Sequence, residues 1–420
     1  MIKTRDMLKH VALNGDDLVM DSTFIKKLLK GECSEHFPEL TGKKGVLFSN
    51  TTLAKFMEDE FRHDNFELTK SYGRSIRTLS SGEQKKALLE FLMAKQPGFI
   101  ILDNPFDALD VASVKQLKER LESIANKMTV IQVFKRRSDL LPFIKHAMRV
   151  DNRKVVFNDG IEQYLEKYEP ETIAHFAIEI PGPLHEQTIR YNELIKLSDV
   201  SVKYRERQIL NSINWTIKAG EFWQLKGPNG SGKTTILTMI NGDNPKAFGQ
   251  NIELFGRRKG TGESVWEIKK KIGYFTPSMM ELFKRRHTAE QMVISGFHDS
   301  IGLYHRPSEI QQHVANNWLK VLGLADKGNR AFVDLSQVHR RMVLIARAMI
   351  KHPPLLILDE PSTGLDDKSA ALLSALINKI SDESQTAILY VSHRTEPDLK
   401  PVFVFELKPG ENGSVGEVVN

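Results

Sequence analysis

Residues 227–234 read GPNGSGKT, which matches the spacing G-x-x-x-x-G-K-[ST] without a gap. The apolar run FWQLK precedes the motif and TILTMING follows it, so it lies between a predicted strand and a predicted helix. Its glycines let backbone N–H groups turn inward around phosphate groups, and the positive end of the following helix favours the same anions. We expect the phosphates of a nucleotide to be bound by Gly227, Pro228, Asn229, Gly230, Ser231, Gly232, Lys233, Thr234 and Thr235.

Particular side chains of this segment have chemical roles that follow from their types. Lys233 can reach the β- and γ-phosphates as a point charge, and the Thr234 hydroxyl can ligate Mg²⁺. Asp359 ends the apolar run LLILD, which is the place for a carboxylate that holds Mg²⁺ through water. The sequence therefore predicts a Mg²⁺–nucleotide site that includes Thr234 and Asp359.

Two further residues are candidates for hydrolysis. Glu360 follows Asp359 directly, so its carboxylate is the candidate base that orients or deprotonates the attacking water. His393 ends the run AILYVSH, where a neighbouring strand can deliver it to the same crevice. We expect Glu360, His393 and Lys233 to be the catalytic groups.

The elements that position these residues occur twice in the chain. Residues 97–103 (PGFIILD) and 353–359 (PPLLILD) are each followed by a proline-containing acidic motif, NPFDALD and EPSTGLD. A leucine-serine helix start precedes each run, and an apolar run, TVIQVFK or AILYVSH, follows it. Buried strands alternating with helices predict a tandem α/β chain with doubly wound sheets. We place the domains at 1–168 and 195–420, with a linker at 169–194 that contains the breaker PGP.

Composition narrows the class of protein. The 420 residues contain no apolar run of the ~18–20 residues that a membrane span needs, and the first ten lack the apolar core of a signal peptide. A single cysteine, Cys33, excludes an internal disulfide and a cysteine-based metal cluster. The net charge of +6 is spread out and forms no dense basic stripe, so it is only weak evidence for nucleic acid as a partner. We expect a cytoplasmic protein, able to lie at the inner face of a membrane beside a separate partner.

The set GPNGSGKTT, LLILDEP, STGLD and YVSH resembles the nucleotide-binding domain of ABC ATPases. The resemblance implies two P-loop domains, each with a mixed sheet and a helical subdomain, that pair head to tail as a pseudo-dimer. It implies that Tyr204 stacks on adenine, and that ATP and Mg²⁺ are the cofactors. FGRRKGTGESVWEIKKKIGYF and VISGFHDSIGLY resemble tandem members classed with molybdate-transport ATP-binding proteins. Molybdate itself rests on that resemblance alone.

The first half departs from this pattern in its Walker motifs. Between LNGDDLVM, taken as the start of the loop strand, and FIKKLLKG, taken as the helix, only DST remains. This reading predicts a shortened loop without a lysine. Asn104 stands where the second half has Glu360, and Lys135 stands where it has His393. An amide cannot act as a base at neutral pH, so we expect no hydrolysis by the first domain alone.

The signature elements show the opposite pattern. The first half keeps Leu79, Ser80, Ser81, Gly82 and Glu83, close to the family's LSGGQ, whereas the second reads Leu335, Ser336, Gln337, Val338 and His339. Ser80 can hydrogen-bond a γ-phosphate and Gly82 allows close backbone approach, but side chains at 337 and 338 obstruct it. Head-to-tail pairing would then give one working composite site and one inactive site. This predicts one ATP per chain.

Pro277 stands where the family has a glutamine that touches Mg²⁺ and water and couples to a transporter. The leading hypothesis is an ATPase subunit of an ABC transporter, acting on membrane permease subunits in a separate chain. A regulatory ATP switch with slow or no hydrolysis is the alternative, which Pro277 favours. A ribosome-acting type is disfavoured, because two intact sites and a long charged helical linker are absent from the sequence.

Overall fold

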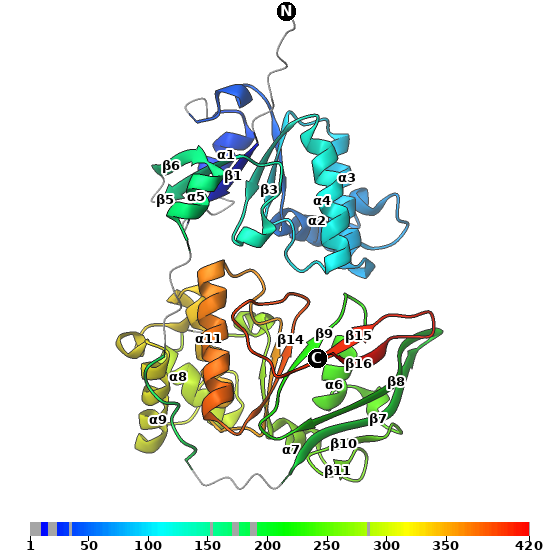
Figure 1. The fold of residues 1–420 in the computed structure, drawn as a ribbon, viewed down its shortest axis with the longest axis vertical. Coiled ribbons are helices and arrows are strands. Elements are labelled where there is room, and N and C mark those ends of the chain that lie inside the picture. The colour runs from blue at the N-terminus through cyan, green and yellow to red at the C-terminus, as the bar shows by residue number, and fades with distance from the viewer. Residues whose placement is uncertain are drawn as a thin grey trace, which may run out of the picture. The chain divides into compact units, whose positions relative to one another are not determined.

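The computed structural model describes residues 10–15, 23–32, 36–151, 154–169, 176–184, 191–283 and 286–419, and Cys33 lies outside them. The chain divides into two compact units, Met1–Glu171 and Thr172–Asn420 (Figure 1). No helix within the described ranges is long and apolar enough to cross a membrane.

The first unit is built on one six-stranded sheet with the order β2-β3-β4-β1-β5-β6. All neighbouring pairs are parallel except β5 and β6. Its internal strand β3 reads FIILD, and the first four residues of this strand are buried, as expected for a strand covered on both faces. The strands are β1 Val11–Asn14, β2 Gly45–Phe48, β3 Phe99–Asp103, β4 Thr129–Val133, β5 His146–Asp151 and β6 Lys154–Gly160.

Helices cover both faces of this sheet. On one face, Ile25 and Leu28 of α1 (Thr23–Leu29) share a core cluster with Phe99 and Ile101 of β3. On the other face, α3 (Ser81–Ala94) and α4 (Val111–Ala125) pack against the alternate residues of β3. The remaining helices are α2 (Asn50–His63) and α5 (Ile161–Lys167).

The second unit repeats this plan. Its six-stranded sheet has the order β12-β13-β14-β9-β15-β16, with only β15 and β16 antiparallel. The α/β fold class is therefore confirmed in both halves. The strands are β9 Phe222–Lys226, β12 Ile272–Phe275, β13 Leu355–Asp359, β14 Ala387–Val391, β15 Phe403–Lys408 and β16 Val415–Val419.

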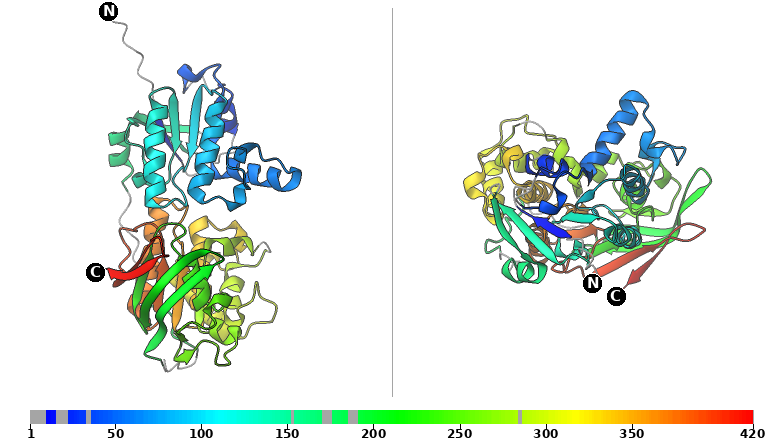
Figure 2. Two further views of the ribbon diagram at one scale, coloured as in Figure 1. Left: turned by 90° about the vertical axis from the view of Figure 1, so that its right-hand side faces the viewer. Right: turned by 90° about the horizontal axis from the view of Figure 1, so that it is seen from above.

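The helices of the second unit lie on both sides of that sheet, and Figure 1 shows α11 and α6 flanking it. One core cluster joins α8–α11 to one face, and another joins α6 and a four-stranded antiparallel sheet, β11-β10-β7-β8, to the other. The long strands β7 and β8 are the large green arrows of Figure 2. The bounds are α6 Lys233–Ile240, α7 Val265–Lys269, α8 Ala289–Ile294, α9 Glu309–Val321, α10 Gln337–Met349, α11 Asp367–Glu383, β7 Glu193–Tyr204, β8 Arg207–Lys218, β10 Ile252–Leu254 and β11 Arg257–Arg258.

The expected shortening of the first loop stays a prediction. β1 ends at Asn14 and the described part of α1 begins at Thr23, whereas residues 227–232 connect β9 to α6. β1 ends after the first two residues of LNGDDLVM. Residues 16–22 lie outside the described ranges, but their sequence, DDLVMDS, contains no lysine.

Part of the segment predicted as a linker packs on the second unit. Phe176, Ile180 and Leu184 lie against the core cluster of α8–α11. The backbone N–H of Ile180 donates to Glu383 Oε2 at 2.9 Å. Residues 176–184 therefore belong structurally to the second unit.

Candidate nucleotide site

The loop of residues 227–232 adopts a backbone that requires glycine. Gly227, Gly230 and Gly232 have φ values of 153°, 79° and 98°, a region that residues with a side chain rarely adopt. A Cβ at Gly227 would lie 2.6 Å from Ser231 Oγ, and one at Gly232 would lie 2.5 Å from the Leu210 side chain. Gly232 is also the residue from which α6 starts. Sterics therefore fix the curved loop at the head of the helix.

The polar groups of the loop fit an anionic ligand. The Lys233 ammonium lies 2.6 Å from the carbonyl oxygen of Gly227 and 3.0 Å from that of Pro228, so it is held inside the curve of the loop. Ser231 is fully buried, and its hydroxyl has no hydrogen-bond partner among the described residues. A buried hydroxyl without a partner is costly, and a phosphate oxygen would satisfy it. Thr234 and Thr235 lie in the first turn of α6.

Strand register brings the acidic pair and the histidine to this loop. Asp359 pairs with Val391 across β13 and β14, and Val391 pairs with Leu225 of β9. Because these strands are parallel, their carboxyl ends meet at one edge of the sheet, where ligands of such folds bind. Asp359, His393 and the loop thus lie at the same edge, as the sequence predicts.

Glu360 and His393 form one hydrogen-bonded unit. His393 Nδ1 lies 2.9 Å from Glu360 Oε1, and the His393 backbone N–H donates to the same oxygen at 3.2 Å. The Thr363 hydroxyl donates to Glu360 Oε2 at 3.1 Å. His393 Nε2 is buried and has no partner in the described part of the chain. The carboxylate is held in one orientation, and Nε2 is left for a further group.

Asp359 is held by an aromatic neighbour that the sequence motifs did not reveal. Burial and the charge of Glu360 raise the pKa of Asp359 to about 6, and Lys233 and the Tyr274 hydroxyl oppose this shift. The Tyr274 hydroxyl donates to Asp359 Oδ2 at 3.4 Å. Tyr274 lies on β12, in register with Ile357 of β13. In the sequence, the apolar run IGYF, which forms the strand beside LLILD, was the feature that could have identified Tyr274.

The residues present fit Mg²⁺ only together with a nucleotide. The described residues contain no group of three His, Cys, Asp or Glu that could hold a metal ion. Mg²⁺ needs six oxygens and keeps several waters, so Thr234 and Asp359 suit an ion that is completed by phosphate oxygens.

Tyr204 lies at the end of β7, in register with Arg207 of β8. Its hydroxyl accepts a hydrogen bond from Asn244 Nδ2 at 2.9 Å, and the side chain is 41% exposed. The ring is therefore tethered at its tip while part of its surface remains accessible.

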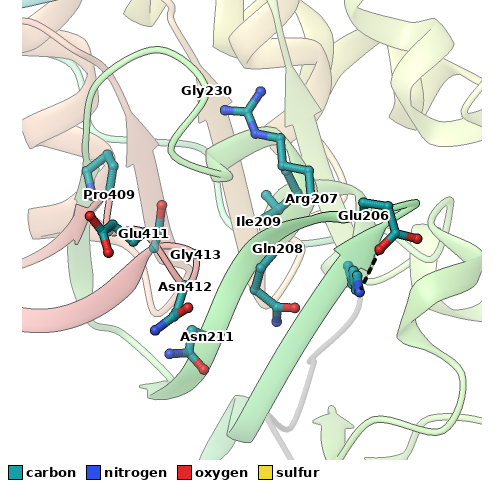
Figure 3. A pocket seen from close by; sticks show the side chains of 13 residues that line it. Glu206, Arg207, Gln208, Ile209, Asn211, Gly230, Pro409, Glu411, Asn412 and Gly413 are labelled. Carbon is teal, nitrogen blue, oxygen red and sulfur yellow. Dashed lines mark ion pairs between the residues drawn. The ribbon is translucent and has the colours of Figure 1, made fainter.

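A hollow of about 840 Å³ lies beside the phosphate loop, between the start of β8 and the connection from β15 to β16. Figure 3 shows Arg207 extending from β8 toward Gly230, whereas Gln208 points to the opposite side. The Arg207 guanidinium is 4.0 Å from the position that a Cβ on Gly230 would take. Glu206 instead pairs with Lys203 at 3.5 Å. Arg207 belongs to no recognisable motif, so only the hairpin between β7 and β8 reveals it.

The first unit repeats the geometry of this edge with different side chains. The N–H of Asn104 donates to Val133 O at 3.1 Å, as that of Glu360 donates to Val391 O at 2.8 Å. Asn104 Nδ2 donates to Asp103 Oδ1 at 2.7 Å, and burial raises the pKa of Asp103. An amide thus occupies the position of the candidate base.

The two signature elements differ in structure as well as in sequence. Ser80 caps α3 in a capping box with Glu83, whose carboxylate accepts from the Ser80 N–H at 2.8 Å. A Cβ on Gly82 would lie 2.7 Å from Ser113 Oγ, so a larger residue there would displace the Ser113 side chain. In the second unit Ser336 also caps a helix, but Val338 packs against the core of its own unit.

Pro277 begins a short 3₁₀ helix directly after β12 and Thr276. The corresponding strand of the first unit, which the sequence did not place with certainty, is β2. Phe48 of β2 pairs with Leu102 as Phe275 of β12 pairs with Leu358. Asn50, at the start of α2, is thus the counterpart of Pro277.

Known proteins are similar to this chain in sequence. Residues 210–363 match the family model described as ABC transporter. The chain is 35% identical over 391 residues to the ABC transporter ATP-binding protein ModF of Escherichia coli K12, covering 89% of this chain and 79% of ModF. It is 32% identical to an ABC transporter ATP-binding protein of Schizosaccharomyces pombe, covering 76% of this chain and 66% of that protein.

Solved structures with a similar fold include the archaeal ribosome recycling factor aABCE1 and the RNase-L inhibitor. The TM-score is 0.60 for each, and the sequence identities are 16% and 15% respectively. Each match covers 97% of this chain, and the matches cover 86% of the aABCE1 chain and 85% of the RNase-L inhibitor chain. At this identity the likeness concerns the fold.

A curved phosphate loop between a strand and a helix, with a strand-end aspartate, glutamate and histidine, defines a P-loop ATPase of the ABC class. The chain belongs to the family of ABC transporter ATP-binding proteins, with ModF among its relatives.

Proposed function

We propose that the chain binds and hydrolyses ATP at one composite site, formed by the phosphate loop of the second unit and the signature of the first. Lys233 and the loop amides bind the phosphates, Thr234 and Asp359 hold Mg²⁺, and Tyr204 stacks on adenine. Mg²⁺ held there would supply positive charge to offset the charge that develops on the phosphates. Glu360 activates the attacking water, His393 orients it, and Ser80 and Gly82 bind the γ-phosphate, largely by positioning and electrostatics.

One observation carries this proposal: the functional losses fall on one of the two sites that head-to-tail pairing creates. The first unit has Asn104 at the position of the base, and its connection contains no lysine, but it keeps Ser80 and Gly82. The second unit has the phosphate loop, but Val338 stands where Gly82 lies in the first. Random loss would affect both sites, so the pattern supports selection for one.

The test combines stoichiometry with paired signature variants. Bound ATP is counted in the Glu360→Gln full chain, and turnover is measured for Ser80→Ala and its matched control Ser336→Ala. We expect one ATP per chain, a loss of turnover of about tenfold or more in Ser80→Ala, and near-normal turnover in Ser336→Ala. Two ATP per chain, or equal effects of the two substitutions, would overturn the composite site.

We propose further that a membrane permease in a separate chain is the partner that this ATPase energises. The names of the relatives, which describe transporter subunits, support this. Co-purification of the chain with a hydrophobic partner from membranes tests it. The regulatory switch would be supported instead if the chain binds ATP, shows no more turnover than Glu360→Gln and has no such partner. The lack of an amide side chain at Pro277 favours this alternative.

A further inference from the structure

A buried cation in each unit makes the same pair of contacts, although the two units differ in their catalytic residues. Lys85 Nζ lies 2.7 Å from the carbonyl oxygens of both Pro105 and Asp107. In the second unit, the Arg341 guanidinium donates to the carbonyls of Pro361 and Thr363 at 2.5 and 2.6 Å. Each cation lies five positions after the signature serine on the helix that this serine caps. The contacts thus join the signature helix to the loop after the acidic strand.

Burial makes these contacts obligatory. Lys85 is 5% exposed and Arg341 is 1% exposed. A charge removed from water must be compensated by polar partners, and the paired carbonyls provide them. Lys86, next in sequence, is exposed and follows no such constraint.

The first unit also keeps the unusual backbone of the loop. Asn104 and Ala108 have φ values of 43° and 59°, and their counterparts Glu360 and Gly364 have 51° and 73°. Alanine is strained at positive φ, whereas glycine is not, so the first unit keeps this conformation against the preference of its own residue. The Ser81 hydroxyl donates to Ala108 O at 3.0 Å and provides a second link from the signature to the loop.

A loop that follows the position of a lost catalytic base has no role in hydrolysis within its own unit. Its retained shape and its two links to residues 80–85 indicate that it supports the signature instead. The links attach the first five residues of α3, which Ser80 caps, to the loop after β3.

We propose that Lys85 is a positioning residue for ATP hydrolysis, which holds Ser80 and Gly82 in the geometry that meets the γ-phosphate. The proposal rests on the composite site described above. Arg341 performs the same attachment in the second unit, where the signature it holds is altered. The contribution of Lys85 to turnover therefore exceeds that of Arg341.

The test uses Lys85→Met, Lys85→Arg and the control Lys86→Met in the full chain. ATP turnover is expressed per folded site, titrated with a fluorescent ATP analogue, and thermal unfolding is recorded in parallel. We expect Lys85→Met to lower kcat about tenfold with KM for ATP changed less than about twofold, because the phosphate loop is intact. Lys85→Arg, which copies the second unit, restores most of kcat, and Lys86→Met behaves as the wild type.

Two results would overturn the proposal. One is a wild-type kcat per folded site in Lys85→Met, whatever its thermal stability, while Ser80→Ala lowers kcat. The other, which applies if Lys85→Met does not fold, is an unchanged kcat in Ser81→Ala, which removes the second link and is expected to lose turnover severalfold. An unchanged kcat in Ser80→Ala would instead refute the composite site itself.

Discussion

The ring nitrogen Nδ1 of His393 and the backbone N–H of His393 both contact one oxygen, Oε1 of Glu360, at 2.9 and 3.2 Å. The two residues are 33 positions apart, and they meet because Asp359 and Val391 are paired in adjacent strands. The Glu360 carboxylate is therefore held by the segment that directly follows β14, and His393 Nε2 remains available for a water or phosphate oxygen.

Glu360→Gln should keep this geometry but remove the negative charge and the basicity. We expect turnover to fall by about 10²-fold or more, the scale of a lost general base, while ATP affinity remains within about threefold. Steady-state ATPase assays and binding of a fluorescent ATP analogue measure both. Asn104→Glu in the first unit is the matched control and should leave turnover unchanged. Equal turnover of Glu360→Gln and the wild type would show that Glu360 is not the base.

Arg207→Gln should weaken nucleotide binding, because the guanidinium lies beside the phosphate loop at Gly230. A charge-assisted hydrogen bond contributes about 1.5–3 kcal/mol, so KM for ATP should rise roughly tenfold or more. Arg205→Gln, in the same hairpin, is the control and should bind ATP normally. Titration with ATP and with inorganic phosphate separates contact with the bound nucleotide from general attraction of anions. Equal binding by the two variants would contradict a role for Arg207.

Glu83→Gln should strengthen ATP binding, because it removes a negative charge from the N-terminal end of α3. We assign this end of the helix to binding of the γ-phosphate. The N–H of Ser80 lowers the pKa of Glu83, so the carboxylate stays charged, and glutamine can preserve the capping box. Charges at helix ends contribute about 0.3–1 kcal/mol, which predicts a decrease in KM of roughly two- to fivefold that shrinks in high salt. Arg74→Gln removes the guanidinium that lies 2.5 Å from the Glu83 carboxylate, and it should raise KM for ATP. A shift of both variants in the same direction would rule out this electrostatic effect.

Pro277→Gln should raise turnover, because it supplies an amide directly after the strand that borders Asp359. We expect kcat to rise by about threefold to tenfold with little change in KM, as for a group that contacts water and Mg²⁺ mainly during reaction. Single-turnover ATPase measurements at saturating Mg²⁺ give the answer. Pro277→Ala separates the added amide from the loss of proline, and a similar rise in both variants would assign the effect to the backbone.

The sequence by itself determined the tandem α/β plan, the position of the phosphate loop and the substitutions at Asn104 and Lys135. These were predictable because they depend on local patterns: apolar runs that end in aspartate, and glycines at fixed spacing before Lys233. The loss of a lysine from the first connection was equally visible, although the sequence misjudged where β1 ends. Strand ends depend on pairing with β4 and β5, which residue types do not specify.

Only the tertiary structure decided which side chains meet. The contact between Glu360 and His393, the hydroxyl of Tyr274 on Asp359 and the approach of Arg207 to Gly230 depend on strand register and hairpin geometry between distant segments. The paired carbonyl contacts of Lys85 and Arg341 are likewise invisible in the sequence, where a lysine and an arginine on a helix resemble solvated charges. Burial turns these two cations into fixed attachments, because a charge removed from water must find its partners inside the fold.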